Sequence, residues 1–157
     1  MQPRFDITAV DPAAYRAMAE MERYLHQTGL GAPLIHIVKL YASEINHCAY
    51  CIDMHWKDLR AMGETEQRLY GLPAWRESPY YTDRERAAFT WTEAVTVVTD
   101  GFVSDDVYES VRPHFSDKEL VELTMVIVTI NSWNRLSIAA RSTAGTYQPT
   151  YAQRQQS

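Results

Sequence analysis

The chain has 157 residues, of which 46% are hydrophobic and 22% charged, and its net charge is −5. This length and composition are typical of one globular domain with its own core. The negative charge and the absence of a Lys/Arg block argue against nucleic acid as a partner, and no apolar run is long enough to cross a membrane. The N-terminus lacks a signal-peptide pattern, and the two cysteines are too close together to staple a fold, so we expect a cytoplasmic protein.

Helix-start and helix-stop signals divide the chain, and no segment alternates like a β-strand. Asp11 precedes a proline as an N-cap, while Thr82 and Ser116 each open a capping box. The expected helices cover residues 12–28, 33–47, 48–63, 82–99, 104–113 and 120–140, with a short helical piece at 64–70. The sequence leaves open whether the helices that meet near His47 are separate or form one bent helix.

The domain organisation predicted from this pattern is simple. We expect an all-α fold in which residues 1–157 form a single domain, with a core from about 11 to 141. The remaining tail, residues 142–157, is polar and rich in glutamine, a composition that favours partial disorder.

Both cysteines and two of the five histidines lie in one short stretch of the sequence, residues 44–55. On a helix, Cys48, Cys51 and His55 share a face. Glu44 lies one turn before the first cysteine, and His36 extends the same face upstream if the preceding helix runs through. A Cys-x-x-Cys pair can cycle between dithiol and disulfide: a peroxide oxidises one thiolate to a sulfenic acid, and the second thiol condenses with it. The stretch therefore predicts peroxidase or disulfide-exchange chemistry.

Other interpretations of these residues stay open. Buried cysteines often act only as small hydrophobic residues, in which case the chain is a scaffold with a non-catalytic pair. Glu44 and His36 can each simply make a hydrogen bond between helices. The stretch also supplies the donor types of a tetrahedral zinc site, namely Cys48, Cys51, His55 and one of His36, His47 or Glu44. Structural zinc sites usually take their second ligand pair from a distant segment, which makes metal binding the minor interpretation.

The motif Cys48-x-x-Cys51-x-x-x-His55 closely resembles the core motif of AhpD-like alkylhydroperoxidases in the carboxymuconolactone decarboxylase superfamily. The resemblance covers most of the chain from about 35 to 141, and it includes the segments 42–46, 53–58, 74–76, 85–88, 120–124 and 130–135. It implies an AhpD-like helical bundle that assembles into homo-oligomers, often hexamers. It also implies an antioxidant reduction of alkyl hydroperoxides that needs no organic cofactor, only an external dithiol protein or small thiol as reductant.

The resemblance also assigns roles to the motif residues. It makes Cys51 the peroxidatic cysteine, Cys48 the resolving cysteine and proton donor, and His55 a member of the proton relay. The chain has His36 where the family usually has a relay glutamate, and Glu44 where it usually has glutamine. His36 and Glu44 are therefore further candidates for the relay, since a histidine with an ordinary pKa of about 6.5 can act as a base. If peroxide reduction is lost, general disulfide exchange is the remaining expectation.

Overall fold

The computed structural model describes residues 2–149, and helices are the only regular secondary structure in that range. The elements are α1 (Ile7–Val10), α2 (Pro12–Leu25), α3 (Ala32–Ile45), α4 (Ala49–Ala61), α5 (Glu66–Tyr70), η1 (Leu72–Ala74), α6 (Asp83–Thr96), α7 (Asp105–Val111), η2 (Arg112–His114) and α8 (Asp117–Ala140). The all-α prediction is confirmed, and every predicted helix is present with ends that differ by at most three residues. Over the described range, no helix combines the length and apolarity that crossing a membrane requires.

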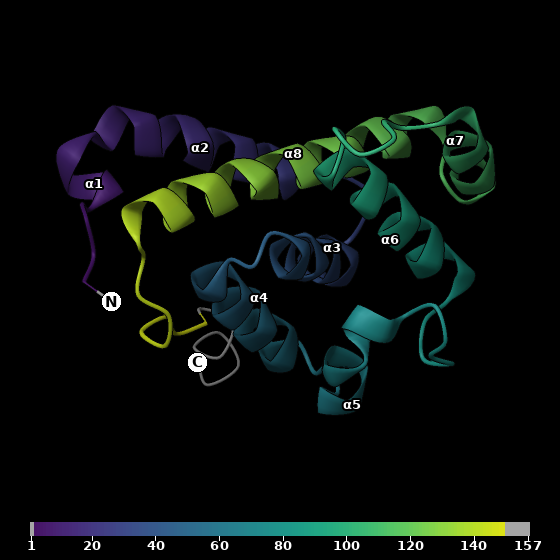
Figure 1. Ribbon diagram of the computed structural model, residues 1–157, viewed down its shortest axis with the longest axis horizontal. Coiled ribbons are helices and arrows are strands. Elements are labelled where there is room, and N and C mark those ends of the chain that lie inside the picture. The colour runs from purple at the N-terminus through teal and green to yellow at the C-terminus, as the bar shows by residue number, and fades with distance from the viewer. Residues whose placement is uncertain (1, 150–157) are drawn as a thin grey trace.

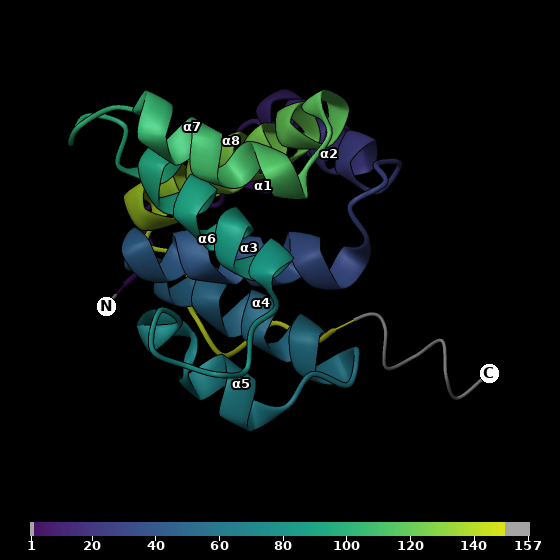
Figure 2. The ribbon, with the colours of Figure 1, turned by 90° about the vertical axis from the view of Figure 1, so that its right-hand side faces the viewer.

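Helix α3 lies at the centre of the domain, with α8 on one side and α4 on the other (Figures 1 and 2). Gly31, at φ 82°, allows the sharp entry into α3, and Pro33 suits the first turn of the helix. Packing by α4, α6 and α8 buries every residue from 35 to 43. Because this buried stretch includes His36 and Lys39, the fold must supply partners for polar groups in its interior.

Helix α8 runs along most of the length of the molecule (Figure 1). Its start is fixed by the predicted capping box, in which Ser116 and Glu119 each bond the other's backbone N–H. Leu123, Ile127 and Ile130 are fully buried against the rest of the core. This face of α8 is therefore part of the core.

The chain between α3 and α4 makes a sharp turn, so the two helices are separate. His47 has φ 56°, a left-handed conformation that ends α3 and redirects the backbone. The side-chain amide of Asn46 donates hydrogen bonds to Asn131 at 3.0 Å and to Asn134 at 2.9 Å, which ties the turn to α8. The face expected to continue from Glu44 onto the next helix is therefore interrupted here.

The described part of the tail lies against α4. The Lys57 ammonium donates to the carbonyl oxygens of Gly145, at 3.3 Å, and Tyr147, at 3.1 Å. The Gly145 N–H donates to the Asp53 carboxylate at 3.0 Å. Residues 142–149 are thus placed by contacts with α4, and the rest of the predicted tail, 150–157, lies outside the described residues.

Candidate active site

Cys48 and Cys51 lie at the start of α4, directly after the turn held by α8. Cys48 is the N-cap of the helix and Cys51 is in its first turn. The structure joins the two sulfur atoms in a disulfide, and the Cα atoms are 5.4 Å apart, within the normal range for a bridge. The fold therefore holds the pair in a position from which it can form and break the disulfide with little backbone movement.

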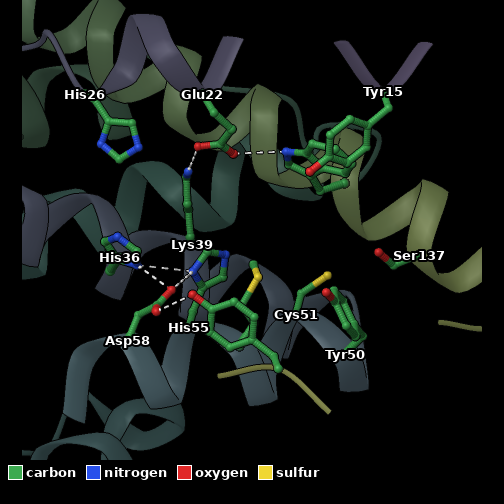
Figure 3. Close-up of a pocket in the computed structure, with 13 residues that line it drawn as sticks. Tyr15, Glu22, His26, His36, Lys39, Tyr50, Cys51, His55, Asp58 and Ser137 are labelled. Atoms are coloured by element: carbon green, nitrogen blue, oxygen red, sulfur yellow. Dashed lines mark hydrogen bonds and ion pairs between the residues drawn. The ribbon is translucent and has the colours of Figure 1, made fainter. Parts of the chain in front are cut away.

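A pocket of about 310 Å³ opens over the start of α4 (Figure 3). Its walls come from α2, α3, α4 and α8, and Cys51 is one of the lining residues. Cys48 is not: it packs behind the pocket with Ala42 and Ile130. Cys51 is only 1% exposed, so a small molecule in the pocket can meet its sulfur while a protein surface cannot.

Three buried side chains meet at one side of this pocket: His36 from α3, and His55 and Asp58 from α4 (Figure 3). The two Nδ1 atoms of the imidazoles are 3.3 Å apart. The Asp58 Oδ2 atom is 3.5 Å from the His36 Nδ1 atom and 4.0 Å from that of His55. All three groups are at least nine-tenths buried, with exposed fractions of 8%, 3% and 3%.

Burial sets the protonation of this cluster. It lowers the pKa of His36 to about 3, with a smaller contribution from the charge of Lys39. It lowers the pKa of His55 well below the ordinary value as well. Both imidazoles are therefore neutral at pH 7, and their contacts with Asp58 are not ion pairs. Burial raises the pKa of Asp58, although a hydrogen bond from Tyr147 opposes that rise.

The Nε2 atom of His55 is turned away from Asp58, because the Nδ1 atom faces the cluster. It is buried and has no hydrogen-bond partner among the residues that the structure describes. His55 lies one helical turn after Cys51 on α4, and both line the same pocket. Because Nδ1 takes part in the cluster, Nε2 is the ring nitrogen of His55 that is left to accept a proton.

An ion pair between a buried lysine and a half-buried glutamate lies across the pocket from this cluster. The Lys39 ammonium on α3 pairs with the Glu22 carboxylate on α2 (Figure 3). Glu22 also accepts a hydrogen bond of 3.0 Å from the Trp133 indole on α8, and the Tyr15 ring packs against the indole at a centroid distance of 5.7 Å. The pocket therefore has a polar, charge-balanced end and an aromatic rim.

The tail closes the pocket on the side of Asp58. The Tyr147 hydroxyl donates a hydrogen bond of 2.7 Å to the Asp58 Oδ1 atom. This bond leaves the Oδ2 atom directed at the two imidazoles. A residue 89 positions away in sequence thus orients the carboxylate.

Two of the candidate residues from the sequence lie elsewhere. Glu44 does not line the pocket, and it faces the side of α3 where its charge acts on Tyr81. His47 is an exposed residue of the turn before α4. His36 and His55, by contrast, do meet in the pocket with Cys51.

The sequence interpretation missed Asp58, Tyr147 and Glu22. Asp58 had a local signal, because it follows His55 by three positions and so shares its helix face. The other two had none, since each reaches the pocket from a distant segment. The zinc set proposed from the sequence is not assembled either. Within the described part of the chain, the only close cluster of metal-ligand atoms contains His36, His55 and Asp58 and neither cysteine.

An all-α domain with a Cys-x-x-Cys pair at a helix start, and a histidine one turn further along, belongs to the AhpD-like class. The model of the carboxymuconolactone decarboxylase family matches residues 12–94. The chain is a member of this family.

Several known proteins are similar to this chain in sequence or in fold. The uncharacterized protein YdfG of Bacillus subtilis is 40% identical over 139 residues, which are 88% of this chain and 95% of YdfG. A solved structure from Agrobacterium tumefaciens matches this chain with a TM-score of 0.89 and 41% identity, over 93% of this chain and all of that one. That structure is of a protein of unknown function, named as a candidate antioxidant defence protein AhpD. A peroxidase-related protein with an AhpD core from Ralstonia eutropha shares the fold, with a TM-score of 0.78 and 19% identity over 88% of this chain and 74% of that one.

Proposed function

We propose that this protein is a thiol-dependent peroxidase that reduces small organic hydroperoxides through the Cys48/Cys51 pair. One observation carries the proposal: Cys51 lines a pocket that also holds two neutral imidazoles, and its sulfur is bonded to Cys48 behind it. A nucleophile, a base and a resolving thiol are the groups that a two-cysteine peroxidase needs.

The first step is attack on the peroxide by Cys51. The His55 Nε2 atom takes the thiol proton, and the thiolate attacks the terminal, hydroxyl-bearing oxygen of the hydroperoxide, which breaks the O–O bond and leaves a sulfenic acid on Cys51. The departing alkoxide takes the proton from His55 and leaves as an alcohol. We assign the remaining proton of the His55 ring to Nδ1, which donates it to His36, so that Nε2 is free to act as the base.

The second step closes the disulfide. The Cys48 sulfur attacks the sulfenic sulfur of Cys51, and its proton leaves with the hydroxyl group as water. Two thiols and one hydroperoxide thus give one disulfide, one alcohol and one water. An external dithiol then reduces the disulfide by attack on Cys51, and the start of α4 stabilises the departing Cys48 thiolate at its N-cap.

The burial of the pair supports peroxide reduction over general disulfide exchange, the second candidate function. Disulfide exchange with a protein requires its sulfur to reach Cys51, which is 1% exposed. A hydroperoxide or a small dithiol can enter the pocket of about 310 Å³, whose rim includes Tyr15 and Trp133. This aromatic rim suits the apolar part of an organic hydroperoxide.

The test is intact-mass analysis with thiol alkylation of reduced, metal-stripped protein before and after one equivalent of cumene hydroperoxide. We expect rapid loss of both thiols and of the mass of two hydrogen atoms. The Cys51→Ser variant should keep its remaining thiol. The Cys48→Ser variant should instead stop at a sulfenic acid on Cys51, which dimedone traps.

The role of His55 as the base is tested separately. His55→Ala should slow oxidation of Cys51 by about 100-fold or more, the usual contribution of a positioned base. His26→Ala is the matched control, because this exposed histidine lies at the same pocket outside the cluster. If wild-type thiols survive the peroxide treatment, the peroxidase proposal is wrong.

A further inference from the structure

The geometry of His36, His55 and Asp58 differs from that of an ordinary hydrogen-bonded triad. Their facing atoms are separated by 3.3, 3.5 and 4.0 Å. All three distances exceed the length of about 2.7–3.2 Å expected for a strong hydrogen bond from nitrogen. In the plane of the three atoms, the point equidistant from them lies about 2.1 Å from each, which is the length of a bond from zinc to nitrogen or carboxylate oxygen.

From this spacing we infer that His36, His55 and Asp58 form a binding site for a divalent transition-metal ion, with Zn²⁺ as the best match. The site goes beyond the peroxidase function and requires neither cysteine. Two imidazoles and a carboxylate are common zinc ligands, and three protein ligands with one open position are typical of reactive zinc sites. All three ligands line the pocket, so water or a small ligand can occupy the fourth position.

The charge of the cluster also favours a cation. Asp58 makes no ion pair with a lysine or arginine in the described part of the chain. The charge of Lys39 does act on Asp58, but Lys39 is already paired with Glu22. A divalent ion would supply the positive charge that a buried carboxylate needs.

The surroundings hold the ligands in place. His55 and Asp58 lie three positions apart on the rigid helix α4, and His36 lies on the fully packed helix α3. Tyr147 donates to the Oδ1 atom of Asp58, which leaves Oδ2 to bind the ion. In metal sites, a carboxylate ligand is regularly oriented by a hydrogen bond from a residue that does not itself bind the metal.

The distances also indicate which geometry the site favours. Ligand atoms lie about 3.3–3.4 Å apart around a tetrahedral ion with bonds of about 2.0–2.1 Å, and about 3.0 Å apart around an octahedral one. The observed separations of 3.3, 3.5 and 4.0 Å are closer to the tetrahedral values. This comparison favours Zn²⁺ over ions such as Mg²⁺ that require octahedral coordination.

Metal binding and proton transfer would exclude one another at His55. An ion bound to the Nδ1 atom moves the remaining ring proton to Nε2, and this nitrogen can then no longer accept the proton of Cys51. The test of the site must therefore measure binding directly and not peroxidase activity.

The experiment uses the full chain in its disulfide form, where the sulfur atoms are not available as ligands. Zn²⁺ is titrated against a chelator that buffers its free concentration, and bound metal is counted by elemental analysis. We expect one equivalent per chain, and the same result for the Cys48→Ser/Cys51→Ser double variant. Co²⁺ in place of Zn²⁺ should give the visible absorption of a tetrahedral ion without a thiolate-to-cobalt band in the near ultraviolet.

Substitutions then identify the ligands. Asp58→Asn keeps the shape of the side chain and should weaken Zn²⁺ binding by about 100-fold or more, because it removes a direct ligand. Tyr147→Phe should weaken it by about 10-fold, as expected for the loss of an orienting hydrogen bond. His26→Ala, at the same pocket but outside the cluster, should bind as the wild type does. Circular dichroism checks that each variant is folded.

Three results would overturn the inference. One is the absence of bound Zn²⁺ in the disulfide form at micromolar free metal. A second is a cobalt spectrum with a thiolate band, which would place the ion on Cys48 and Cys51. The third is a folded Asp58→Asn variant that binds Zn²⁺ as tightly as the wild type.

Discussion

Glu44 shows how strongly the position of one residue depends on the tertiary structure. Its Oε2 atom is buried and has no hydrogen-bond partner within the described residues. Burial raises its pKa to about 7. The carboxylate lies outside the pocket of Cys51, so its relay role, which the resemblance suggested, stays a prediction without support from the geometry.

The raised pKa of Glu44 predicts that the stability of the folded protein depends on pH. The folded state holds the proton up to about pH 7, while the unfolded chain releases it near the ordinary value of 4.5. The free energy of unfolding should therefore fall as the pH rises between these values, and Glu44→Gln should avoid this loss. Relative to the wild type, the free energy of unfolding of the variant should rise by about 2 kcal/mol as the pH increases from about 5 to about 8. This value allows for the partial access of solvent to the carboxyl group.

Urea unfolding of both proteins at the two pH values measures this difference. Glu77→Gln, at an exposed position, is the control. A gain that is the same at both pH values would contradict the prediction. Loss of peroxidase activity in Glu44→Gln would independently support the relay role.

At the level of the helices, the central position of α3 determines which groups meet in the pocket. Because α3 is enclosed, Lys39 cannot reach solvent and pairs with Glu22 of α2. The same carboxylate accepts the Trp133 indole N–H of α8. Glu22 therefore connects three helices at the pocket.

Removal of Glu22 should leave a buried positive charge unpaired. We expect Glu22→Ala to lower the free energy of unfolding by about 3 kcal/mol, near the lower end of the range for a broken buried pair. In the Glu22→Ala/Lys39→Met double variant both charges are gone, so most of that loss should be recovered. Denaturant unfolding of the single and double variants tests the pair, and equal losses in Glu22→Ala and the double variant would show that the charge is not the cause.

At the level of the whole molecule, the outer face of α8 leaves apolar side chains uncovered. Val121 is 61% exposed and Val128 is 40% exposed. They are seven positions apart and so lie on the same side of the helix. A groove that includes Val121 is also lined by Trp91 and Tyr108. This surface is the place where we expect copies of the chain to meet if the protein forms the homo-oligomers that its family resemblance implies.

The oligomer prediction is tested by changing this face alone. Size-exclusion chromatography with light scattering should give an oligomer for the wild type and a monomer for Val121→Lys/Val128→Lys, because charge on an apolar interface opposes association. The exposed double variant Glu109→Lys/Arg112→Glu, at the end of α7 and the start of η2, should leave the mass unchanged. A monomeric wild type would contradict the prediction.

Much of the fold was predictable because helix limits depend on neighbouring residues. The capping boxes at Thr82 and Ser116 and the proline after Asp11 act within one turn of the chain, and each begins a helix in the structure. The relation of Cys48, Cys51 and His55 is equally local, since all three belong to the start of one helix. The sequence by itself therefore determined the all-α class, the approximate limits of the longer helices and the position of the cysteine pair.

The tertiary structure decided what surrounds that pair. The left-handed residue His47, which is not a glycine, turns α4 away from the direction of α3, and this turn separates Glu44 from the cysteines. Asp58 was within reach of a sequence argument but was indistinguishable from other helical carboxylates. Tyr147 reaches the pocket only through folding of the described tail against α4. Contacts between distant segments depend on how the helices pack, and the local preferences that a sequence shows do not fix that packing.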